Sequence, residues 1–369
     1  VKRTIHQEAT PINNLYADDK SGLLAVDSNV WDLEIGNFLA DVEKFRGRRI
    51  AADRQNLSQD EETVTRLSEF VDKSKLANWG MNKEAFPLTV QEQDSVIDGA
   101  LSSDGKTALR YSSKILYLMD LKSGKTHSEN VEGNLQLNRI YQAGFSRDSQ
   151  KIIFVGLREE LDTSAQFPTL DYKYFVLTYD IASRSIDSDI PLDESIKYFV
   201  PAGNRTIVYL NNSGELVQFD YLNGHVTTRF NEKIPLRSNI GKFRIDRNNR
   251  YLYAISAENS VIVFEVNQGR WLAKLANLKD GTWAVVDPEG RFDTNNLDEI
   301  KGLHWVLSDD PMRPVPLEVF LRDYYQPRLL SRLLAGEKFP SVKPLMSLNR
   351  IQPEVRVSKV EPVAGDPSH

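Results

Sequence analysis

The chain has 369 residues, a length that favours two domains or one large repetitive fold. Hydrophobic residues make up 40% and charged residues 27%, a composition typical of globular proteins. Forty-six basic and 52 acidic residues give a net charge of −6 without a long run of either sign, so nucleic acid is not an expected partner. The absence of cysteine excludes disulfides and a cysteine nucleophile within these residues, and no apolar stretch is long enough to span a membrane.

From the N-terminus to about residue 310, short apolar stretches alternate with polar turns, and helical periodicity is weak. Residues 2–7 alternate charged and less polar side chains like a strand, and 152–155, 206–210, 251–255 and 261–264 are predicted strands. A polar turn recurs seven times between such stretches, at 19–22, 58–61, 102–106, 146–150, 201–205, 246–250 and 287–291. Asp, Asn and Gly, including Gly105 and Gly290, suit these turns because hairpins need a positive φ or a side chain that closes the turn.

A second element follows most of these turns, a large apolar residue and then an acidic one. The copies are Trp31-Asp32, Met119-Asp120, Tyr179-Asp180, Phe219-Asp220 and Phe264-Glu265, with Trp79-Gly80 as a degenerate copy. Successive copies lie 40 to 60 residues apart, and a unit near 40 residues that carries four short strands is typical of one propeller blade.

The turn, two strands and residues 30–36 (VWDLEIG) together resemble the WD-repeat β-propeller family. The resemblance covers roughly residues 1–307, although one true Trp-Asp pair remains and the Gly-His pair that begins family repeats is absent. It implies an all-β fold, a propeller of about seven blades over residues 1–310, with six or eight as alternatives. Residues 2–7 are expected to close the last blade, which would hide an exposed sheet edge.

Two segments are candidate protein contacts. Arg46, Arg48 and Arg49 form the densest basic cluster, which either binds an acidic partner or is a solvated turn. The longest repeat step contains an insertion at 157–172, in which Phe167 and Pro168 are a plausible contact point. An insertion in a hairpin projects from a propeller, so it is either a binding loop or a tolerated addition.

Motifs for catalysis, cofactors or metals are weak. Residues 99–107 (GALSSDGKT) have five residues between the glycines where a phosphate-binding loop has four, and the segment coincides with a predicted turn. Five scattered histidines show no ligand spacing, and His304 is interpreted as a packing residue. The sequence therefore predicts no cofactor, no metal and no catalytic residue.

The last 60 residues are built differently. Leu317, Phe320, Leu321 and Tyr324 share one helical face, Pro327 breaks the helix, and a leucine-rich helix follows up to Gly336. Residues 311–340 are thus expected to be a helical clasp on the propeller rim or a connector to a further domain. Residues 341–369 are an expected extended tail, in which 353–363 alternate like the first strand of another domain.

Residues 281–293 (GTWAVVDPEGRFD), 303–306 (LHWV), 316–320 (PLEVF) and 324–330 (YYQPRLL) form a distinctive series. Over about residues 278–362 it resembles the junction after the propeller in bacterial WD-repeat proteins that continue into a caspase-like cysteine peptidase domain. The resemblance implies a sensing or docking module of a protease, with a peptidase domain of the same polypeptide as partner. Without cysteine, this chain itself is not expected to be an enzyme.

The leading hypothesis is a non-catalytic propeller that binds protein partners and regulates such a protease. The alternative is a stand-alone propeller that binds a small ligand or acts as a hydrolase through its central channel. The expected compartment is the cytoplasm, or the periplasm or exterior if a leader precedes Val1 and is removed.

Overall fold

The structure is a computed structural model that describes residues 15–18, 23–26, 29–32, 37–41, 96–102, 104–112, 115–162, 169–234, 243–246, 248–256, 260–278, 282–297, 303–307, 310 and 312–345. The expected strand at 2–7, the turns at 19–22 and 58–61, Trp79-Gly80 and nearly all of the tail lie outside the described residues.

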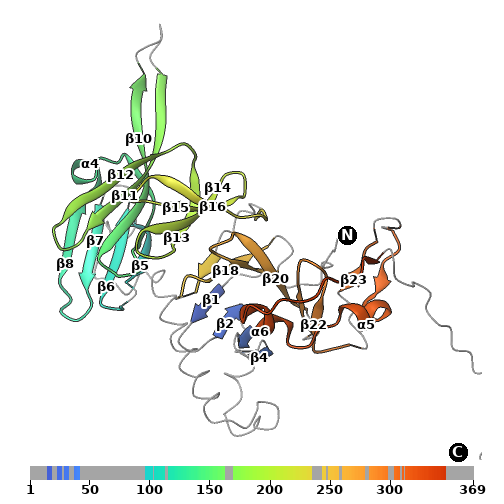
Figure 1. The fold of residues 1–369 in the computed structure, drawn as a ribbon. Coiled ribbons are helices and arrows are strands. Elements are labelled where there is room, and N and C mark those ends of the chain that lie inside the picture. Colours follow the sequence, from blue (N-terminus) through green and yellow to red (C-terminus); the bar gives the residue numbers. More distant parts are fainter. Residues whose placement is uncertain are drawn as a thin grey trace, which may run out of the picture.

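Four sheets of four strands and one sheet of six strands account for most of the described chain (Figure 1). The first two sheets contain β1 (Leu15–Asp18), β2 (Leu23–Val26), β3 (Asn29–Asp32) and β4 (Asn37–Asp41), then β5 (Val96–Leu101), β6 (Thr107–Ser112), β7 (Ile115–Asp120) and β8 (Thr126–Asn130). After the single helical turn α4 (Val131–Asn134) come β9 (Arg139–Phe145), β10 (Lys151–Asp162), β11 (Thr169–Asp180) and β12 (Ser185–Leu192), then β13 (Ile196–Pro201), β14 (Thr206–Asn211), β15 (Leu216–Asp220) and β16 (His225–Arg229). The six-stranded sheet contains β17 (Phe243–Ile245), β18 (Tyr251–Ile255), β19 (Val261–Glu265), β20 (Arg270–Asn277), β21 (Trp283–Val286) and β22 (Phe292–Thr294). Within each sheet, strands that are consecutive in the chain pair antiparallel.

The middle strands are apolar on both faces, and both faces are buried. In β10, Ile152 and Phe154 pack against the sheet that precedes it, whereas Ile153 and Val155 pack against the sheet that follows. Because side chains alternate along a strand, such an uninterrupted apolar run fits a strand covered on both sides. The sheets therefore stack face to face.

The stacking continues through the whole series of described sheets. Separate apolar clusters join β5–β8 to β9–β12, β9–β12 to β13–β16, and β13–β16 to β17–β20. A further cluster joins the six-stranded sheet to the first sheet, where the rings of Trp31 and Trp283 meet edge to face with centroids 5.4 Å apart. The first strands of these sheets contact one another in the order β5, β9, β13, β17 and β1. The N-terminal sheet thus lies beside the last sheet of the series.

The seventh repeat unit differs from the expectation of a separate blade. Its turn at 287–291 joins β21 to β22, and both strands extend the sheet of β17–β20. β21 can join this sheet because β20 is long. The first residues of β20 pair with β19, and Lys274 to Asn277 pair with β21 along the other edge of β20. The seventh unit's described strands thus belong to the six-stranded sheet.

The C-terminal segment packs on this six-stranded sheet. It contains β23 (His304–Trp305) paired with β24 (Val315–Pro316), the 3₁₀ turn η3 (Leu317–Phe320), α5 (Leu321–Tyr324) and α6 (Leu329–Leu334). Leu317, Phe320 and Tyr324 surround Trp305 on one side of the sheet, whereas Leu329 and Leu330 of α6 join the cluster of Trp31 and Trp283. None of the helices in the described residues has the length and apolar character needed to cross a membrane.

A buried arginine ties this segment to the sheet. The guanidinium of Arg291 donates to Asp287 Oδ2 at 2.7 Å, to Glu289 Oε2 at 2.8 Å and to the carbonyl of Pro340. The ring of Phe339 lies close to two guanidinium groups, with its centroid 5.1 Å from Cζ of Arg291 and 4.4 Å from Cζ of Arg332. The side chains of Arg291 and Asp287 are 4% and 2% exposed, so this ion pair is shielded from water.

We expect Arg291→Ala to lower the free energy of unfolding by about 3–5 kcal/mol, because it leaves a buried carboxylate without its cation. Arg270→Ala is the matched control, since Arg270 and its partner Glu265 are 56% and 30% exposed and that pair is worth at most about 1 kcal/mol. Urea unfolding measures both. Equal losses in the two variants would contradict a structural role for Arg291.

Candidate partner-binding site

The hairpin of β10 and β11 is longer than the sheet that carries it. Both strands have 12 residues, but β9 pairs with β10 only as far as Leu157, and β12 pairs with β11 only from Tyr174 onward. Residues 158–162 and 169–173, which we call the arm, pair with each other beyond that point. Five residues of extended chain span roughly 17 Å. Figure 1 shows the arm projecting from the sheet.

The base of the arm is fixed by aromatic and charged contacts. The ring of Tyr174 stacks on Tyr141 with centroids 5.9 Å apart. The guanidinium of Arg158 lies 4.1 Å from the centroid of Phe175 and donates to Asp189 Oδ2 at 2.7 Å. These contacts hold the two strands in one direction where they leave the sheet.

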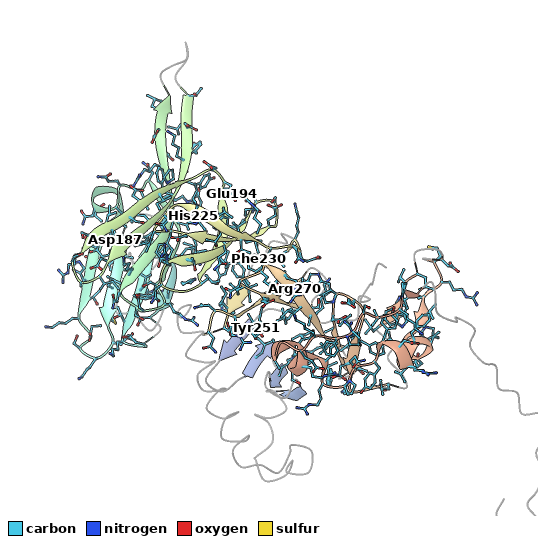
Figure 2. The ribbon with its side chains drawn as sticks, viewed as in Figure 1. Asp187, Glu194, His225, Phe230, Tyr251 and Arg270 are labelled. Atoms are coloured by element: carbon cyan, nitrogen blue, oxygen red, sulfur yellow. The ribbon has the colours of Figure 1, made fainter. Side chains whose placement is uncertain are left out.

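The two faces of the arm differ in chemistry. Leu161, Leu170 and Tyr172 lie on one face and are 63%, 46% and 52% exposed. The opposite face carries an ion pair between Lys173 Nζ and Glu160 Oε2 at 2.5 Å. Figure 2 shows side chains on both strands of the arm standing clear of the rest of the sheet. Exposed leucine and tyrosine side chains on an ordered strand pair are typical of a protein contact surface.

Sequence reasoning located this region but missed its structure. The insertion at 157–172 was expected to be a projecting loop, whereas its described residues continue β10 and β11. Phe167 and Pro168 lie outside the described residues, as do Arg46, Arg48 and Arg49, so those candidate contacts stay predictions. The alternation of Leu170, Asp171 and Tyr172 is the sequence signal for a strand with two different faces in this region.

The repeated aspartates act within their own sheets. Asp120, Asp180 and Asp220 end the third strand of their sheets and accept the backbone N–H of the residue three positions later, at 2.6, 2.8 and 3.0 Å. These hydrogen bonds hold the pKa of Asp120 and Asp180 below the usual range of aspartate. The side chain of Asp32 lies outside the described set, and Trp31 is fully buried.

In four of the described copies of the other repeated turn the residue at the fourth position is left-handed, whereas in the copy at 201–205 it is Gly203 at the third position. Gly105 and Gly290 have φ values of 72° and 106° at the fourth position, and Ser149 and Asn249 occupy the same place with 60° and 55°. Glycine takes this conformation without the steric cost that a Cβ adds. The segment 99–107, which was compared with a phosphate-binding loop, contains such a turn between β5 and β6, and Ser102 Oγ accepts the N–H of Thr107 at 2.9 Å.

One polar cluster was not anticipated. His127 Nε2 lies 2.6 Å from Glu129 Oε1, which also accepts the hydroxyl of Tyr179 at 2.7 Å. The cluster links β8 to β11 and thus connects two neighbouring sheets. Over the described ranges, no three His, Asp or Glu side chains are grouped as metal ligands would be, and the absence of a cofactor or metal stays a prediction.

No protein-family model matches the chain. No curated protein matches it either. Among solved structures, it is similar to the C-terminal WD40 domain of Sif2, with a TM-score of 0.36 and 13% sequence identity over 52% of this chain and 54% of that chain. The match spans about half of that domain.

The turn aspartates predict a dependence of stability on pH. Burial alone would raise the pKa of Asp220, but the N–H groups of Asn223 and Leu222 and the guanidinium of Arg205 outweigh it and lower the pKa. The unfolded chain then binds the proton on Asp220 more tightly than the folded chain does. The stability that Asp220 adds to the folded chain is therefore complete above about pH 4, the ordinary pKa range of aspartate, and is lost as the pH falls further.

We therefore expect Asp220→Asn to lower the free energy of unfolding by roughly 1.5–3 kcal/mol at pH 7, because its hydrogen bonds lose the charged acceptor. Below about pH 4 the variant is expected to lose stability less steeply than the unaltered protein. Urea unfolding from pH 3 to 7 measures the effect, with Asp310→Asn, an exposed acid outside the repeated turns, as control. Parallel pH profiles for the Asp220 variant and the unaltered protein would contradict the assignment.

Proposed function

We propose that this chain is a non-catalytic protein-interaction module in which stacked sheets form a rigid scaffold and the arm contacts the partner. The observation that carries the proposal is the exposure of Leu161, Leu170 and Tyr172 together on one face of a strand pair that extends beyond its sheet. A monomeric surface seldom gathers large apolar side chains on a projecting, ordered element without a binding role.

The scaffold in this proposal is a β-propeller. Four-stranded antiparallel sheets in series, stacked on both faces, with their first strands adjacent, support it. The proposed propeller spans residues 1–310 with about seven WD-repeat-like units, of which the last shares the six-stranded sheet, and with closure by residues 2–7. A helical clasp over 311–340 and an extended tail over 341–369 complete the proposal.

We further propose that the module regulates a bacterial caspase-like protease in the cytoplasm, with the peptidase domain of the same polypeptide as one partner. The support is the resemblance of residues 278–362 to the junction in such proteins. Residues of that segment hold the C-terminal part on the sheet, as Arg291 does with Pro340 and as Asp293 Oδ2 does by accepting the N–H of Leu329 at 3.3 Å. Neither nucleic acid nor a membrane is part of the proposal.

Selection from a phage-displayed library of random peptides on the intact chain tests the interaction function. We expect enriched peptides to bind at least about tenfold more weakly to the triple variant Leu161→Ser, Leu170→Ser, Tyr172→Ser, because exposed aromatic and aliphatic anchors carry most of the affinity of an interface. The matched control replaces Leu121, Leu222 and Val226 by serine, residues that are 39–41% exposed on other strands and turns. Equal binding to both variants would contradict the role of the arm, and turnover of a hydrolase substrate panel by the chain would contradict its non-catalytic nature.

The protease association has a separate test. DNA sequencing onward from the codon for His369 is expected to reveal a histidine and then a cysteine, each in a strand–loop context, since that chemistry needs a thiolate and a general base. A downstream sequence without this pair would contradict the protease part of the proposal and leave the interaction function to stand on the arm.

A further inference from the structure

One edge of the arm is open to another strand. Among the described strands, residues 169–173 of β11 pair only with β10, because β12 ends opposite Tyr174. All five residues are exposed. Open edges usually carry charges, bulges or proline that discourage pairing. This edge carries the charged residues Asp171 and Lys173, but it also exposes Leu170 and Tyr172.

The other edge of the arm is already occupied near its base. On β10, the N–H of Glu159 donates to Asn138 Oδ1 at 2.8 Å, and Arg158 Nε donates to the carbonyl of Gln136 at 2.7 Å. The segment before β9 therefore covers the start of this edge. The edge of β11 offers the longer uncovered stretch.

The backbone of Tyr172 faces this open edge. Tyr172 is paired with Glu159, whose N–H points away from β11 to Asn138, so the two residues form a non-hydrogen-bonded pair of the antiparallel ladder. The N–H of Tyr172 donates instead to Asp171 Oδ1 at 2.9 Å. By the alternation of the ladder, Leu170 also directs its backbone groups to the open edge. A carbonyl of an added strand can replace the carboxylate as acceptor and release Asp171 for another contact.

The side chains specify what such a strand must carry. Leu170 and Tyr172 lie on one face and Asp171 on the other, so residues added opposite them alternate apolar, then charged, then apolar. The arm has four acidic residues, Glu159, Glu160, Asp162 and Asp171, and two basic residues, Arg158 and Lys173, which gives it a net charge of −2. Both basic residues already form ion pairs, whereas in the described part of the chain the carboxylates of Glu159 and Asp171 form none.

We infer that the partner presents an extended segment of the pattern apolar–Lys or Arg–apolar, which adds as a strand to β11 at residues 169–173. This inference rests on the proposed function and names the chemistry of its partner. Backbone hydrogen bonds supply affinity in strand addition, and the alternating side chains supply specificity.

A second copy of this chain fits the edge less well. Antiparallel pairing of the whole stretch 169–173 with itself places Asp171 opposite Asp171, and like charges directly opposite each other destabilise a strand pair. A basic partner segment avoids this repulsion and neutralises the acidic arm.

Synthetic peptides test the inference on the intact chain by isothermal titration. The blocked peptide Thr-Val-Lys-Val-Thr is expected to bind about fivefold or more tightly than Thr-Val-Glu-Val-Thr, and Asp171→Lys is expected to reverse this preference. Asp193→Lys, which changes an exposed acid outside the arm, is expected to keep it. Methylating the two valine amides is expected to weaken binding, whereas methylating the lysine amide is expected to leave it nearly unchanged, since an added strand turns alternate N–H groups to its neighbour.

Several results would overturn the inference. They are the absence of a lysine preference, a preference that survives Asp171→Lys, equal effects of the two methylation patterns, and a concentration-dependent dimer in sedimentation with no peptide bound. If any of these results is found but the binding of the selected library peptides still depends on Leu161, Leu170 and Tyr172, the interaction function stands and only the inference of a basic strand partner fails. If they do not, the proposed function fails as well.

Discussion

The burial of the middle sheets on both faces is the interaction on which the rest of the structure depends. Strands such as β10, with Ile152 and Phe154 in one cluster and Ile153 and Val155 in the next, make the sheets of β9–β12, β13–β16 and β17–β22 each part of two cores at once. The contact of Trp31 with Trp283, joined by Leu329 of α6, adds the first sheet and the C-terminal segment to the same series. Since the faces are used for stacking, strand ends, edges and extensions are the places left for contacts with other molecules.

The arm follows from this constraint. Up to Leu157 and Tyr174 its strands belong to a stacked sheet, and beyond these residues their apolar side chains face water. An isolated hairpin is marginally stable, so the arm depends on its base, where Tyr174 meets Tyr141 and Arg158 meets Phe175. A strand edge held in place before the partner arrives reduces the entropy that binding must overcome.

Hydrophobic alternation and turn residues in the sequence predicted individual strands and the turns between them. The strands expected at 152–155, 206–210, 251–255 and 261–264 lie within β10, β14, β18 and β19, and the turns expected at 102–106, 146–150 and 246–250 connect paired strands. Pairing over longer distances was not predictable, because nothing near Trp283 indicates that β21 adds to the free edge of β20. The arm was missed for a related reason: its charged residues suit a loop as well as a strand, and pairing across residues 163–168 decides between them.

Hydrogen exchange at single-residue resolution on the intact, unbound chain tests the central claim, that β11 passes from a buried strand to one with an open edge. The account predicts slow exchange at the amides of residues 175–179, which are buried between paired strands. Within residues 169–173 it predicts alternation, with protected amides at Asp171 and Lys173, which face β10, and fast exchange at Leu170 and Tyr172. Uniform protection from 169 to 179, or no protection anywhere between 169 and 173, would contradict it.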